Sequence, residues 1–111
     1  MALNWFDNYI LEGHTPRQVD WETYLAWAKQ GFDVTRRVAK TMLGEVEVST
    51  VFLSIDHGFG DGPPILFETM VFGGPHDERQ WRYSTWDAAV VGHERIVGAL
   101  RDGRDPDEGA E

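Results

Sequence analysis

The chain has 111 residues, of which 41% are hydrophobic and 13% aromatic, and this content predicts one folded domain with a single core. Its 19 acidic and 10 basic residues give a formal net charge of −9. That balance argues against a nucleic-acid partner, because lysine and arginine are needed to replace the counterions of the phosphates. It also argues against anionic membrane surfaces. The absence of cysteine excludes disulfides and thiolate zinc sites.

The chain contains no targeting or membrane signal that we can identify. No apolar stretch approaches the ~20 residues of a membrane span. The N-terminus lacks the basic region and the apolar run of a signal peptide. We therefore expect a cytoplasmic protein without a membrane partner.

The first third of the chain predicts one helix. Residues 3–15 are rich in aromatic side chains but show no sustained period, and we interpret them as a short helical turn or arm packed on the core. Asp20 is a good N-cap, with Thr15 as an alternative start. An apolar stripe of helical period follows, which we expect to pack in the core: Trp21, Tyr24, Leu25, Ala28 and Phe32.

After this helix the hydrophobic period changes to two, which predicts strands. Segments 36–43 and 46–55 flank a plausible tight turn at Gly44-Glu45. Segment 65–72 is apolar on both of its faces, which is typical of a central strand. Segment 80–83 could supply a short fourth strand.

The chain ends in a second predicted helix. Ser84 or Thr85 caps it, and His93 lies on its apolar face, where we expect a hydrogen-bonded core histidine. The domain is expected to cover residues 1–100, and the acidic stretch 101–111, without an apolar anchor, is predicted to be disordered. The predicted fold class is α+β, with an antiparallel meander of three or four strands packed with an N-terminal and a C-terminal helix.

The connection between the two apolar strand segments, residues 56–64, is the most distinctive local feature. Its glycines let the backbone approach a ligand closely, and Asp56, His57 and Asp61 supply titratable or metal-binding groups. It is not a phosphate loop, because the spacing and the lysine of that motif are missing. In the plainer interpretation, its glycines and prolines only shape a long hairpin connection.

Three histidines stand next to acidic residues, at positions 57, 76 and 93. In an antiparallel hairpin His57 and His76 lie beyond opposite ends of the strands, about 25–30 Å apart at ~3.3 Å per residue. They therefore cannot share a metal ion. We predict no metal site, no cofactor and no catalytic residue.

Glu68 interrupts a strongly apolar strand, and a buried charge there needs a partner or a raised pKa. The candidate partners are Arg36, Arg37 and Arg82. Glu68 then either forms a cross-strand ion pair on a solvated face, which we favour, or acts as a ligand anchor or acid–base group in a pocket.

Several segments form a recognisable set: VSTVFL (48–53), DH (56–57), GFG (58–60), PP (63–64), LFETMVFGG (66–74), RYSTW (82–86) and GHE (92–94). They resemble a family of small proteins encoded by tailed bacteriophages and prophages, many of them of actinobacterial hosts. The resemblance covers nearly the whole chain except the acidic tail. It implies a phage accessory protein that acts inside a bacterial host cell, and it implies no catalytic residue.

These observations favour a non-enzymatic binding module whose partner is a host protein or a small-molecule ligand. They are also compatible with a homo-oligomer. The candidate binding residues are Asp56, His57, Phe59, Asp61, Glu68, Trp81 and Arg82. An anti-defence role, by capture of a nucleotide-like signal, would need a basic patch from Arg36, Arg37, Lys40 and Arg82. Two alternatives stay open: a small metal-dependent or acid–base hydrolase that uses the 56–64 loop, and a virion assembly component.

Overall fold

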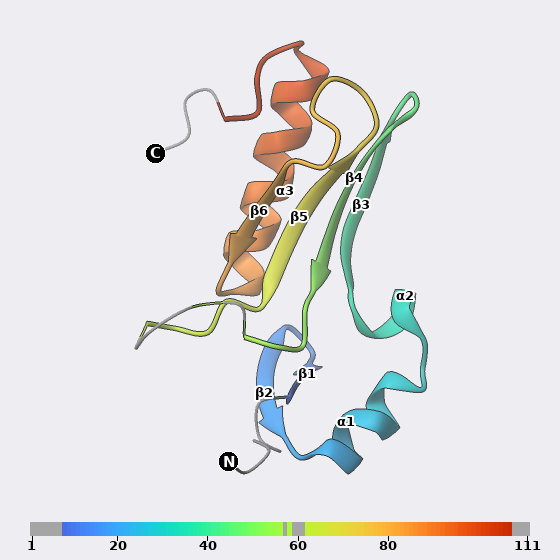
Figure 1. The fold of residues 1–111 in the computed structure, drawn as a ribbon, viewed down its shortest axis with the longest axis vertical. Coiled ribbons are helices and arrows are strands. Elements are labelled where there is room, and N and C mark those ends of the chain that lie inside the picture. Colours follow the sequence, from blue (N-terminus) through green and yellow to red (C-terminus); the bar gives the residue numbers. More distant parts are fainter. Residues whose placement is uncertain (1–7, 57, 59–61, 108–111) are drawn as a thin grey trace.

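The computed structural model describes residues 8–56, 58 and 62–107, which form an α+β fold (Figure 1). A two-stranded and a four-stranded antiparallel sheet are present, the larger with the order β3-β4-β5-β6. The predicted α+β class and the four-stranded meander are confirmed. No helix in the described part of the chain is long and apolar enough to cross a membrane. The elements are β1 (Asn8–Glu12), β2 (Thr15–Val19), α1 (Trp21–Ala28), α2 (Phe32–Thr35), β3 (Arg37–Leu43), β4 (Val46–Phe52), β5 (Phe67–Phe72), β6 (Gln80–Tyr83) and α3 (Trp86–Arg101).

The N-terminal hairpin departs from the sequence prediction. A helical turn or arm was expected over residues 3–15, but the described part forms β1 and then enters β2. Gly13 has φ +62°, which permits the tight turn between the strands. Ile10 and Val19 are buried, so the hairpin has an apolar side of its own. Thr15 begins β2, and the alternative helix start at this residue is wrong.

Helix α1 begins where the sequence predicted, because Asp20 accepts a hydrogen bond from the backbone N–H of Thr23 at 2.9 Å. The predicted burial of its apolar stripe is wrong. No residue of α1 is buried, Trp21 is 43% exposed, and Phe32, which belongs to α2, is 51% exposed. The reason is position: α1 lies beyond the end of the larger sheet and does not cross its face (Figure 1).

Helix α3 covers one face of the larger sheet. Thr85 is its cap, since its hydroxyl accepts a hydrogen bond from the N–H of Ala88 at 3.1 Å. Alternate residues of β4 and β5 face this helix, as expected from the period of two. The fully buried apolar residues of the resulting core are Val48, Phe52, Leu66, Phe67, Val71, Ala89 and Ile96.

Two strand boundaries differ from the prediction. β4 stops at Phe52 because Ser54 takes a positive φ of 71°, which breaks the regular ladder. Ile55 then forms an isolated bridge to Asn8, which links the end of this strand to the N-terminal hairpin. β5 begins at Phe67, two residues later than expected.

The chain folds back after α3. Pro106 is fully buried, and its carbonyl accepts a hydrogen bond from Arg95 Nη1 at 2.8 Å. Asp107 Oδ1 accepts a hydrogen bond from Trp81 Nε1 at 2.7 Å, and Asp107 also pairs with Arg79. These contacts differ from the predicted tail without an anchor. Residues 108–111 lie outside the described range.

Candidate functional site

The loop predicted as a binding site is only partly described. Asp56 braces it, because its Oδ1 accepts hydrogen bonds from the backbone N–H groups of Gly58 and Ile65, both at 2.8 Å. This carboxylate ties the two ends of the connection together, which fits the interpretation of the loop as a shaped hairpin connection. Three predicted residues lie outside the described part of the chain: His57, Phe59 and Asp61.

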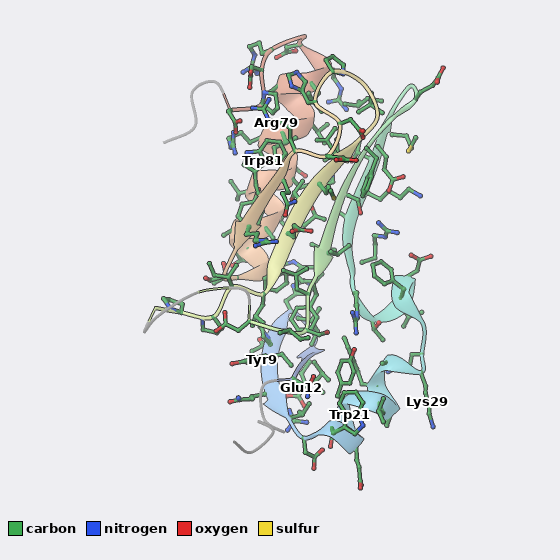
Figure 2. All side chains as sticks on the ribbon, viewed as in Figure 1. Tyr9, Glu12, Trp21, Lys29, Arg79 and Trp81 are labelled. Atoms are coloured by element: carbon green, nitrogen blue, oxygen red, sulfur yellow. The ribbon has the colours of Figure 1, made fainter. Side chains whose placement is uncertain are left out.

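Glu68 forms a cross-strand ion pair. Its Oε2 lies 3.0 Å from Arg82 Nε, the two residues are direct partners in the β5–β6 register, and their side chains are 16% and 41% exposed. The favoured interpretation of Glu68 is therefore confirmed. Trp81 is adjacent to Arg82 and points to the opposite face, toward the core beneath α3. Figure 2 shows Trp81 beside Arg79, at the end of the molecule opposite Trp21. The described members of the predicted set, which are Asp56, Glu68, Trp81 and Arg82, thus do not gather into one site.

The arginines proposed for a basic patch are already engaged. Arg36 donates to the hydroxyl of Tyr24 and lies over its ring. Arg37 donates to Ser49 Oγ at 2.6 Å and pairs with Asp33 at 3.1 Å. Together with Arg82 of the β5–β6 ion pair, three of the four proposed cations therefore have partners within the protein. Capture of a nucleotide-like signal stays a prediction from the sequence.

A cavity of about 420 Å³ lies where the N-terminal hairpin, α1, α2, the start of β3 and the start of α3 meet. Its volume falls in the range of ~300–1,000 Å³ that is common for small-molecule sites. His14, from the turn of the hairpin, stacks on Trp86, the first residue of α3, with ring centroids 3.8 Å apart and 6° between the planes. Trp27 of α1 adds a third ring. The other lining residues are Leu11, Gly13, Gln30, Val34, Thr35 and Arg37.

The two tryptophan rings of the cavity pack against phenylalanines of the buried core. Trp86 packs edge-on against Phe67, with centroids 6.3 Å apart, and Trp27 packs edge-on against Phe52 at 5.9 Å. Phe52 and Phe67 are themselves neighbours on the face that α3 covers. The indoles are thus fixed before any ligand enters, which lowers the entropic cost of binding.

Sequence reasoning missed this cavity. Its residues come from five elements or their connections and share no local motif, so only the tertiary arrangement unites them. The one visible signal is Trp86, directly after the cap of the last helix, a position where an aromatic side chain ordinarily indicates core packing. Trp86 has that role too, since it contacts the Phe52–Phe67 cluster.

His93 is at the centre of a buried polar cluster beneath α3. It is 4% exposed, with Nδ1 2.7 Å from Thr50 Oγ1 and Nε2 2.9 Å from Thr41 Oγ1. Thr50 Oγ1 also shares a hydrogen bond with Thr69 Oγ1. Burial lowers the pKa of His93, so the ring is neutral near pH 7. The prediction of a hydrogen-bonded core histidine is confirmed.

The described residues offer no metal site. Within residues 8–56, 58 and 62–107, no three histidine, aspartate or glutamate side chains lie close enough together to hold a metal ion. His76 Nδ1 lies 3.0 Å from Arg79 Nη1, and His93 is held by threonines. Neither histidine is therefore arranged as a ligand.

Comparisons with known proteins give no further indication of the function. Comparison of the chain with protein-family models, with curated proteins and with solved structures finds no match. The resemblance to phage proteins stays an expectation from the sequence. The function is therefore inferred from the aromatic cavity itself.

Proposed function

We propose that the protein is a phage accessory module that binds a small, flat, uncharged or cationic ring compound in the aromatic cavity. The stacked pair of His14 and Trp86 carries this proposal, since a preformed aromatic face accepts flat rings by stacking and cations through the ring quadrupole. Trp27 supplies a second fixed indole in the same cavity. The phage context comes from the sequence resemblance alone.

The charges of the cavity lining and of the whole chain favour an uncharged or cationic ligand. Among the described residues, Arg37 is the only lysine or arginine that lines the cavity, and its guanidinium already contacts Ser49 and Asp33. The net charge of −9 gives the chain a potential that attracts cations and repels anions. A host protein is a weaker candidate for this concave site, because the cavity has the volume of a small-molecule pocket.

A fluorescence titration with one ring in three charge states tests the proposal. We expect nicotinamide and the N-methylnicotinamide cation to change the tryptophan emission saturably, and the nicotinate anion to leave it unchanged. Trp86→Leu should abolish the change. Trp21→Leu is the matched control, since Trp21 is exposed and does not line the cavity. A Trp86→Leu variant that titrates like the native protein, or a panel without any saturable change, would contradict the proposal.

A further inference from the structure

A second, smaller cavity of about 200 Å³ lies between β3 and α3, lined by Thr41, His93, Glu94, Val97 and Arg101. It shares no lining residue with the aromatic cavity. At about 30 Å³ for each water-sized group, it has room for roughly six or seven heavy atoms. That is the size of alanine, serine or γ-aminobutyrate.

A hydrogen-bond chain ends in this cavity. It runs from Thr69 through Thr50 and His93 to Thr41, with three hydrogen bonds among three hydroxyls and one neutral imidazole. These groups carry one proton more than the three bonds use. The extra proton must leave the chain at one of its ends.

The surroundings allow either end to release the proton. In the first order, Thr69 donates outward, and the buried hydroxyl of Tyr83 nearby supplies an acceptor oxygen. In the second order, Thr69 donates inward to Thr50, Thr50 donates to His93 Nδ1, and His93 Nε2–H donates to Thr41. The hydroxyl of Thr41 is then free to donate into the cavity, and an acceptor bound there favours this second order.

Opposite charges line the same cavity. Glu94 and Arg101 are seven residues apart on α3, so they lie two turns apart on one face. Neither side chain makes a hydrogen bond or ion pair with another described residue, whereas the side chain of each of the other seven arginines does. The cavity thus offers an unpaired carboxylate, an unpaired guanidinium and a hydroxyl that can donate to a bound acceptor, beside the apolar side chain of Val97.

We infer that this cavity binds a small zwitterionic amino acid, with its carboxylate held by Arg101 and Thr41 and its ammonium held by Glu94. Charge-assisted hydrogen bonds at both ends are stronger than neutral ones. A ligand of zero net charge also avoids the repulsion that an anion meets at this acidic protein. The site is separate from the aromatic cavity and does not depend on the function proposed for it.

An NMR titration of the full chain at neutral pH tests the inference. The probes are alanine, β-alanine and γ-aminobutyrate, which differ in the spacing of their charges, with acetate and ethylamine as ligands of a single charge. We expect saturable shifts of the backbone amides of Thr41, His93 and Arg101. At least one amino acid should bind about tenfold or more tightly than acetate and ethylamine.

Variants separate this site from general surface binding. Arg101→Gln and Glu94→Gln, both at exposed positions, should each weaken binding about tenfold or more, and Thr41→Ser should retain binding that Thr41→Val loses. Arg104→Gln is the matched control, because Arg104 is an exposed arginine paired with Asp102 and does not line the cavity. The inference is overturned if no amino acid shifts these signals, if acetate binds as tightly, or if Arg101→Gln binds like the native chain.

Discussion

Gly92 leaves room for Tyr83, and this contact gives the sharpest stability prediction. A Cβ at Gly92 would lie 2.2 Å from the Tyr83 hydroxyl oxygen and 2.4 Å from Cζ, distances that no real side chain shows. Gly92→Ala must therefore displace the tyrosine ring or α3. Overpacking of this kind costs about 1–3 kcal/mol, while alanine gains about 1 kcal/mol of helix propensity over glycine. We expect a net loss of stability of up to about 2 kcal/mol.

Gly98→Ala on the same helix is the matched control. A Cβ at Gly98 meets nothing within 4 Å, so this variant should gain about 1 kcal/mol from helix propensity alone. The difference between the two variants then isolates the contact with Tyr83, at about 1–3 kcal/mol. Urea unfolding followed by circular dichroism measures it, and 1 kcal/mol corresponds to a shift of roughly 4–8 °C in Tm for a domain of this size.

A second substitution tests whether the Tyr83 hydroxyl is the group that the new Cβ would contact. Tyr83→Phe removes the atom nearest to the new Cβ and also a buried hydroxyl that has no hydrogen-bond partner. In the Tyr83→Phe background, Gly92→Ala should therefore cost less than in the native chain. The reasoning is refuted if Gly92→Ala proves as stable as Gly98→Ala, because α3 would then not press against Tyr83.

Three further predictions follow from the core and the surface. Burial lowers the pKa of His93 from its usual value near 6.5, so protonation favours the unfolded chain, and the stability is full above about pH 6.5 and declines below it. Urea midpoints should therefore fall more between pH 7 and 5 for the native chain than for His93→Gln. Equal falls in the two proteins would contradict this prediction. Thr50→Val leaves His93 and Thr69 without their shared partner and should cost about 1–3 kcal/mol in urea unfolding, whereas a neutral result would show that the buried groups find other partners. Arg79→Ala removes two ion pairs with exposed carboxylates, a hydrogen bond with His76 and a cation–π contact with Trp81. Because such contacts at the surface are weak, stability should change by no more than about 1 kcal/mol, and a larger loss of Tm would mean that the residues around Asp107 form part of the core.

The sheet and the last helix could be predicted because their signals are local. A period of two marks the strands, Gly44 marks their turn, and a threonine before an apolar run marks the start of α3. Glu68 and His93 could also be interpreted correctly, since a charge and an imidazole within apolar segments each require a partner. In all these cases one short segment carries the information.

The N-terminal hairpin, α1 and the aromatic cavity could not be predicted for the opposite reason. A helical stripe such as Trp21 and Leu25 shows that a helix is amphipathic but not whether a sheet lies beneath it. The cavity needs His14 from one turn to meet Trp86, more than seventy residues later in the chain. The glycine-rich loop drew attention by its composition, yet Asp56 there holds backbone N–H groups.

The return of the chain at Pro106 has a mechanical consequence. A pulling force applied at Asp107 acts first on its side-chain contacts with Arg79 and Trp81, and then on the bond between Arg95 and the Pro106 carbonyl. These contacts lie in series ahead of α3, so they yield before the helix bears the load. A handle attached at this end for single-molecule stretching should therefore record a small, early release that precedes the unfolding of the sheet.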